Sequence, residues 1–120
     1  MAAVGPDKMS AGAELILQAA DKNDPRPLWI TAWGGTNTLA QALLHARATR
    51  SREALSTLVS RLRVYTISDQ DDAGPWIRRE FPALHYIAIP STPDGDQYPA
   101  ATWTGISGDR FYRNADGADF

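Results

Sequence analysis

Residues 27–44 read Pro27-Leu28-Trp29-Ile30-Thr31-Ala32-Trp33-Gly34-Gly35-Thr36-Asn37-Thr38-Leu39-Ala40-Gln41-Ala42-Leu43-Leu44. The stretch opens with an apolar run over 28–33, rich in aromatic and β-branched residues, which is typical of a strand buried on both faces. Two glycines end this run, and apolar residues then recur at helical spacing over 39–46. The small polar residues at 36–38 are expected to accept the free backbone N–H groups of the helix start. The stretch therefore predicts a strand, a glycine turn and a helix.

The rest of the chain repeats this alternation. Ser10 and Ser51 are expected to cap two further helices, and the acidic stretch Asp69–Asp72 precedes another. Strands are predicted at 62–68 and 84–89, whereas no clear period follows Ser91. Strands separated by helices imply parallel pairing with right-handed crossovers. The fold class is therefore α/β, with a Rossmann-like parallel sheet and flanking helices.

Three strands make a thin parallel sheet. Its edges would expose unpaired backbone groups, and parallel sheets are normally covered by helices on both faces. Because the apolar runs are dense and the predicted strands are so few, we interpret residues 1–120 as an incomplete domain.

Composition excludes several classes of partner. The chain has 12 basic and 14 acidic residues, a net charge of −2 and no basic block, so a nucleic-acid partner is not expected. It has no apolar run near the roughly 18 residues that span a bilayer, and its first residues do not resemble a secretory signal. It has no cysteine, which rules out disulfides and thiolate metal sites within these residues.

The glycine turn is the first candidate site, because open α/β sheets bind ligands at the carboxyl ends of their strands. Gly34 and Gly35 would let a sugar or a metal approach the backbone, and Asn37 could donate to a sugar hydroxyl. The alternative is an ordinary strand-to-helix turn with a polar cap.

Asp69, Asp71 and Asp72 form the second candidate site, after the strand at 62–68. Carboxylates there could bind sugar hydroxyls, join a cation shell or act as a general base toward water. The alternative is helix capping, with a favourable interaction with the helix dipole. Asp69 is the first choice because it directly follows the strand.

Tryptophans supply the third set of candidates. Trp33, Trp76 and Trp103 could form apolar walls on which a sugar or a base stacks, although core packing is an equally good interpretation of each. Trp29, inside the first strand, is expected in the core.

Three long motifs carry a family resemblance. Residues Ala20–Leu43, Leu62–Ile77 and Ala101–Arg113 resemble the nucleoside-hydrolase-like domain of the cellulose-binding protein family, a former domain of unknown function. The likeness extends from about residue 10 to residue 120, and the motifs occur in the same order.

The resemblance implies a hydrolase of N- or O-glycosidic bonds that attacks a ribosyl or other sugar with water activated by Ca²⁺. By position, the backbone carbonyl of Trp33 would contribute to the Ca²⁺ shell. The aspartate-rich first strand of nucleoside hydrolases has no counterpart before Pro27. This chain is therefore expected to be inactive by itself and to bind Ca²⁺ weakly at most, and the expected ligands of the family are a sugar, a nucleoside or a polysaccharide.

Two alternatives remain open. The domain could be a non-catalytic binder of cellulose or another carbohydrate on a hydrolase scaffold, because fold does not fix function. It could also be a truncated product without a selected function. Members of the resembling family often carry export signals, so a longer parent is expected to be secreted in some cases.

Overall fold

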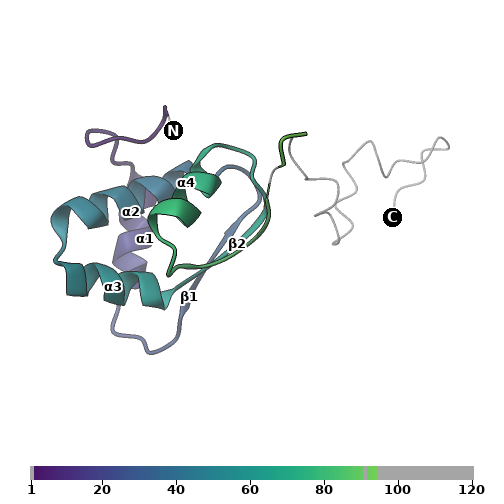
Figure 1. The fold of residues 1–120 in the computed structure, drawn as a ribbon. Helices are drawn as coiled ribbons and strands as arrows, with labels where there is room; N and C mark the ends of the chain where they lie inside the picture. Colours follow the sequence, from purple (N-terminus) through teal and green to yellow (C-terminus); the bar gives the residue numbers. More distant parts are fainter. Residues whose placement is uncertain (1, 91, 95–120) are drawn as a thin grey trace.

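The computed structural model describes residues 2–90 and 92–94. The elements follow in the order α1 (Ala11–Ala20), β1 (Leu28–Ala32), α2 (Asn37–Thr49), α3 (Arg52–Arg61), β2 (Leu62–Ser68), α4 (Ala73–Glu80) and β3 (His85–Ile89) (Figure 1). The predicted alternation of helices and strands is confirmed, and the second strand has the predicted bounds.

Serine caps begin two of the helices as predicted. The Ser10 hydroxyl accepts a hydrogen bond from the backbone N–H of Ala13 at the start of α1, at 3.2 Å. The Ser51 hydroxyl does the same for Ala54 at the start of α3, at 3.2 Å. Such a cap stabilises a helix by about 1 kcal/mol, so both helix starts are encoded locally.

The sheet is parallel, as predicted, with the strand order β1-β2-β3. Ile30 pairs with Val64, which pairs with Tyr86, so these three side chains share one face. The register between β2 and β3 shifts between Tyr65 and Ser68, close to the carboxyl ends of both strands.

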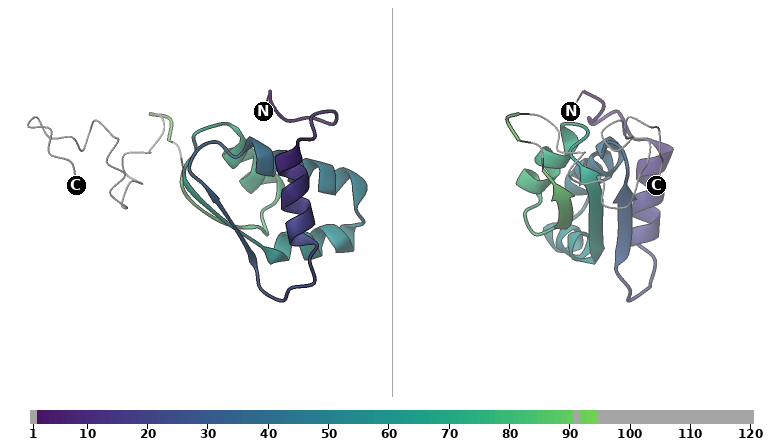
Figure 2. Two further views of the ribbon diagram at one scale, coloured as in Figure 1. Left: turned by 180° about the vertical axis from the view of Figure 1, so that it is seen from behind. Right: turned by 90° about the vertical axis from the view of Figure 1, so that its right-hand side faces the viewer.

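The core lies between this face and the helices. Figure 2 shows the four helices that the structure describes on one side of the sheet. Leu43 of α2, Leu62 and Val64 of β2, and Ile77 of α4 are fully buried in the shared cluster. Apolar burial against a single sheet face thus stabilises the arrangement.

The opposite face of the sheet is bare in the described residues. Trp29 is 54% exposed, Ile87 43% and Ile89 40%. The predictions that the first strand is buried on both faces and that Trp29 lies in the core are therefore wrong for the described part of the chain. The reason is that every described helix packs against the face of Ile30 and Val64, which leaves the alternate side chains uncovered.

None of the described helices is long and apolar enough to cross a membrane.

Candidate functional site

The two predicted polar stretches meet at the carboxyl edge of the sheet. The turn of Gly34 and Gly35 follows β1, and the acidic stretch Asp69–Asp72 follows β2. Because β1 and β2 are paired and parallel, the two stretches lie side by side, and α2 and α4 both begin there. This is the edge where open α/β sheets place their ligands.

Asp71 joins these two helix starts. Its Oδ2 accepts a hydrogen bond from the backbone N–H of Asn37 at 3.2 Å, and its Oδ1 accepts one from Ala73 at 2.9 Å. The Thr36 hydroxyl also donates to Oδ1, at 3.4 Å. The negative charge of this one carboxylate therefore interacts favourably with the positive, N-terminal ends of both α2 and α4.

The N-terminus of α2 corrects one prediction. Thr36 is the N-cap residue but makes no capping hydrogen bond with its own side chain. The cap comes instead from the carboxylate of Asp71, 34 residues further along the chain from Asn37. A charged acceptor brought in by the neighbouring strand forms a stronger hydrogen bond with an N–H than a neutral hydroxyl does.

The two glycines of the turn play different parts. A Cβ on Gly35 would lie 2.1 Å from Oδ2 of Asp71 and 2.8 Å from its Cγ, so Gly35 makes room for the carboxylate. A Cβ on Gly34 would meet nothing within 4 Å. Gly35 is therefore needed by the structure, whereas Gly34 leaves open space beside the backbone.

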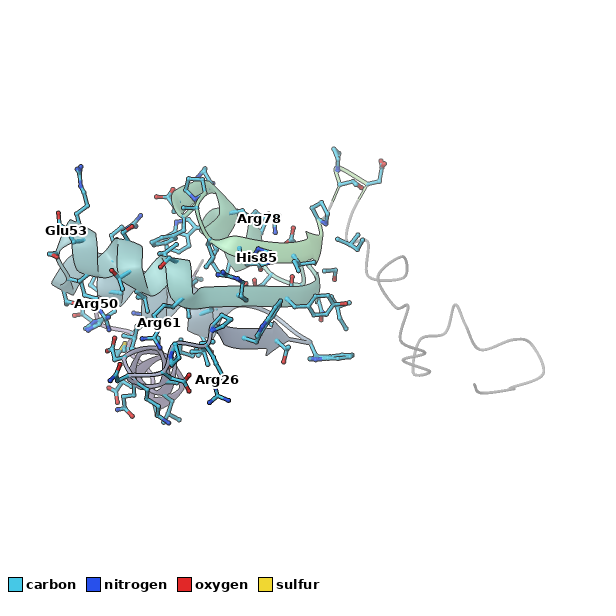
Figure 3. The ribbon with its side chains drawn as sticks, turned by 90° about the horizontal axis from the view of Figure 1, so that it is seen from below. Arg26, Arg50, Glu53, Arg61, Arg78 and His85 are labelled. Atoms are coloured by element: carbon cyan, nitrogen blue, oxygen red, sulfur yellow. The ribbon has the colours of Figure 1, made fainter. Side chains whose placement is uncertain are left out.

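Asp69 is committed to an ion pair. Its side chain is 2% exposed, and its two oxygens accept hydrogen bonds from the guanidinium of Arg78 at 2.8 and 2.6 Å. Arg78 belongs to α4, and its guanidinium lies 5.3 Å from the centroid of the Tyr86 ring on β3 (Figure 3). The hydrogen bond to Asp69 raises the pKa of Arg78, against a smaller opposing effect of burial. Both oxygens of the first-choice catalytic carboxylate thus face a guanidinium.

Gly74 allows Asp69 to occupy this position. A Cβ on Gly74 would lie 2.3 Å from Oδ1 of Asp69 and 3.1 Å from the hydroxyl of Tyr86. The first turn of α4 therefore packs directly on the ion pair.

Several polar atoms of this edge are buried without a hydrogen-bond partner. Among the described residues they include Asn37 Oδ1 and Ser68 Oγ. Burial raises the pKa of Tyr86, although the nearby hydroxyls of Thr66 and Thr36 partly oppose this. Each buried polar group without a partner lowers the free energy of unfolding by about 1–3 kcal/mol, so these groups destabilise the fold at this edge.

A cavity of about 240 Å³ opens at the carboxyl end of β1. Trp33, which is 54% exposed, lines it together with the open backbone at Gly34. The remaining wall residues are Ile16, Ile30, Thr31, Ala32, Gly35, Thr36, Thr38 and Leu39. An aromatic ring beside threonine hydroxyls and open backbone is suited to a ring-shaped ligand that carries hydroxyl groups.

The structure brings some predicted site residues together and separates others. Gly34, Gly35, Asn37 and Asp71 form one cluster, and the exposed Asp72 stands beside it at the start of α4. Trp103 lies outside the described residues.

Trp76 lies elsewhere, against Phe81, with a ring-centroid distance of 5.8 Å. The guanidinium of Arg47 sits 5.4 Å from the centroid of its ring. Arg47 is about 15 Å along α2 from Asn37. A role for Trp76 in substrate binding stays a prediction that this geometry does not support.

Sequence reasoning missed Arg78 and Gln70. Arg78 neutralises Asp69, and the side-chain amide of Gln70 donates to the carbonyl of Trp33 at 3.1 Å. The only signal for Arg78 was the rule that a buried carboxylate requires a cation. No pattern singled out Gln70.

The described residues do not supply a calcium shell. Ca²⁺ takes six to eight oxygens, yet the oxygens of Asp69 face Arg78 and those of Asp71 accept N–H groups. Within residues 2–90 and 92–94 there is no group of three or more acidic or histidine side chains that could hold a metal. The carbonyl of Trp33 already accepts a hydrogen bond from Gln70.

Comparisons with known proteins found similarity to a family model and to a solved structure. The family model described as "Cellulose-binding Sde182, nucleoside hydrolase-like domain" matches residues 1–119. Among solved structures, the chain is similar to a nucleoside hydrolase-related hypothetical protein from Saccharophagus degradans that is associated with carbohydrate metabolism. The two are 52% identical with a TM-score of 0.72, and the match covers 73% of this chain and 21% of that one. No curated protein matches the chain.

Proposed function

Because the chain belongs to the family of cellulose-binding, nucleoside hydrolase-like domains, we propose that the cavity at the carboxyl end of β1 binds a carbohydrate. The observation that carries this proposal is the exposed indole of Trp33 beside the open backbone of Gly34, both of which line the cavity. A sugar ring has an apolar face that stacks on an aromatic side chain and hydroxyl groups around its rim.

The polar side chains that line the cavity would form hydrogen bonds with the hydroxyl groups of the sugar. Thr31 and Thr38 are exposed and line the same cavity, so their hydroxyls can exchange hydrogen bonds with a ligand. Asp71 positions this wall because it fixes the start of α2. We assign it a positioning role, since its oxygens are occupied by N–H and hydroxyl donors.

The chain offers a matched pair of tryptophans for the test. Trp29 and Trp33 lie on the same stretch, and both are 54% exposed, but only Trp33 lines the cavity. Titration calorimetry with cellopentaose should show that Trp33→Ala weakens binding at least tenfold while Trp29→Ala leaves it unchanged. Equal losses in the two variants, or no heat from the wild-type chain, would contradict the proposal.

Cleavage of a glycosidic bond is the second candidate, with a nucleoside or a longer glycoside as substrate. It is favoured by the solved relative's description as nucleoside hydrolase-related and by the exposed carboxylate of Asp72 beside the turn. Because the described residues lack a calcium shell, a hydrolase that uses Ca²⁺ would need ligands from other parts of the polypeptide. Release of reducing sugar from cellopentaose or of base from a nucleoside, abolished by Asp72→Asn, would establish cleavage. Turnover by Asp72→Asn at the wild-type rate would remove this residue from the reaction.

A further inference from the structure

A second hollow lies at the opposite end of the sheet, where β1 and β2 begin. Leu28 pairs with Leu62 in the parallel register, so Arg61, the last residue of α3, lies beside the segment 21–27 that leads into β1. A cavity of about 270 Å³ opens there, which we call the amino-edge cavity. Among the described residues it shares no lining residue with the proposed carbohydrate cavity, so the two are separate.

Positive charge predominates in the amino-edge cavity. Three cationic side chains and one carboxylate line it, which leaves two positive charges uncompensated; these residues are Lys22, Arg26, Arg61 and Asp24. Figure 3 shows Arg61 between Arg50 and Arg26. Arg50 does not add to the imbalance, because it pairs with Asp21 at 2.7 Å.

Arg61 is held in place without being neutralised. Its Nη2 donates to the backbone carbonyls of Lys22 and Asp24, at 2.9 and 2.7 Å. These carbonyls carry no net charge, so the guanidinium keeps its positive charge. Its Nε and Nη1 make no hydrogen bond within the part of the chain that the structure describes. A side chain that is already held loses little conformational entropy when a ligand binds.

The carboxylate of Asp24 is occupied by Arg26. Nε and Nη2 of Arg26 donate to its two oxygens, the shortest distance being 2.6 Å, and the backbone N–H of Arg26 donates to Oδ1 at 3.0 Å. Pro25 and Pro27 flank Arg26 and have fixed φ angles, which restricts this segment. Asp24 therefore compensates Arg26, whereas Lys22 and Arg61 form no ion pair within residues 2–90 and 92–94.

We propose that the amino-edge cavity binds a small anionic ligand through a phosphate or sulfate group. Lys22 and Arg61 supply charged donors, which form strong hydrogen bonds with the oxygens of such a group. The apolar side chains of Ala19 and Leu28 line the same cavity and would contact the rest of the ligand. Two uncompensated charges match one such group, whereas a nucleic acid requires a longer positive surface. This site does not depend on whether the other cavity binds a carbohydrate.

Two charged sugars and one neutral sugar test the proposal. Glucose 6-phosphate, glucose 6-sulfate and glucose are each titrated into the 120-residue chain at constant ionic strength, and the amide resonances are followed by NMR. We expect saturable shifts at residues 22–28 and 61–62 with at least one ester and none there with glucose; the ester that binds more tightly identifies the preferred group. Shifts at these residues that glucose also produces, or no saturable shifts there with either ester, would overturn the proposal. Shifts confined to residues 31–38 would also overturn it, but would leave the carbohydrate cavity as proposed.

Charge substitutions separate a binding role from a structural one. Arg61→Gln should weaken ester binding about fivefold, whereas Arg52→Gln, exposed about 13 Å away along α3, should change it less than about twofold. Asp24→Asn removes a negative charge and should strengthen binding about twofold, which a loss of structure would not do. Equal effects of Arg61→Gln and Arg52→Gln, or weaker binding by Asp24→Asn, would contradict the proposal.

Lys22→Gln decides the matter if Arg61→Gln does not fold. Lys22 is exposed, and its ammonium group makes no hydrogen bond to any other described residue, so the fold does not depend on it. This substitution should weaken ester binding about threefold and leave the melting temperature within about 2 °C of wild type. Unchanged ester binding by Lys22→Gln would refute the site.

Discussion

Polar groups at the amino edge and at the carboxyl edge of the sheet differ in how far they are hydrogen-bonded. At the amino edge, the guanidinium of Arg61 donates to the carbonyls of Lys22 and Asp24, and the side chain of Asp24 pairs with Arg26. At the carboxyl edge, Gly34 leaves open space and Asn37 Oδ1 is buried without a partner. Hydrogen bonds from arginine side chains satisfy these groups at the amino edge, whereas the carboxyl edge keeps a buried amide oxygen without a partner among the described residues. This contrast supports the proposed carbohydrate site at the carboxyl edge.

The largest expected effect is at Asp69. Asp69→Asn removes the charge that neutralises Arg78, and breaking a buried ion pair costs about 3–5 kcal/mol. Because Arg78 is 31% exposed and water can partly solvate it, we expect about 2–3 kcal/mol of lost unfolding free energy in urea titrations. The double variant Asp69→Asn with Arg78→Leu should recover part of this loss. If Asp69→Asn lowers the free energy of unfolding by less than about 0.5 kcal/mol, the ion pair does not stabilise the carboxyl edge as described.

Asp71 is expected to come next. Asp71→Ala removes the acceptor for the N–H groups of Asn37 and Ala73, and each lost cap costs about 1 kcal/mol, so unfolding free energy should fall by about 2 kcal/mol. Hydrogen exchange should accelerate at both of these amides. Asp72→Ala is the matched control, because Asp72 makes no capping hydrogen bond with its side chain. Acceleration at only one of the two amides would mean that the carboxylate does not link the helices.

The adjacent glycines give the sharpest contrast at lower magnitude. Gly35→Ala places a methyl group against the carboxylate of Asp71 and should cost about 1–2 kcal/mol of unfolding free energy. Gly34→Ala meets open space and should change stability by less than about 0.5 kcal/mol. Thermal unfolding of the two variants checks this order, and the reverse order would contradict the assigned packing.

The amino edge should show the smallest effect. The Arg26 side chain holds the pKa of Asp24 at about 2, below its ordinary value. A lowered pKa in the folded state means that the ionised pair stabilises the fold at neutral pH, and this contribution disappears as the pH falls from about 4 to about 2. Because the pair of Asp24 and Arg26 lies at the surface and water screens it, wild type and Asp24→Asn should differ only slightly in melting temperature at pH 7 and should coincide at pH 2. If the difference in melting temperature between wild type and Asp24→Asn instead grows as the pH falls to 2, the predicted pH dependence is contradicted.

The sequence predicted the elements because their signals are local. The apolar run at 28–33, the serine caps at Ser10 and Ser51, and the alternation of strands and helices each reside within a few residues. The glycine turn and the acidic stretch were each predicted at the carboxyl end of a strand, and the parallel pairing of β1 with β2 brings them together.

The features that the sequence did not predict depend on interactions between different elements of the chain. The capping of α2 by Asp71 spans 34 residues, and the pairing of Asp69 with Arg78 requires α4 to turn back over the strand end. The exposure of Trp29 depends on which face the helices occupy, which the pattern of a single strand does not specify.

The most direct test of the carbohydrate site compares the two edges in one experiment. An amide nitrogen–proton NMR spectrum of the 120-residue chain is recorded during titration with cellopentaose. We predict that the resonances of residues 31–38 shift in a saturable way, while those of Asp24, Arg26 and Arg61 stay in place. Shifts centred on the amino edge, or no saturable shifts at the carboxyl edge, would contradict the account.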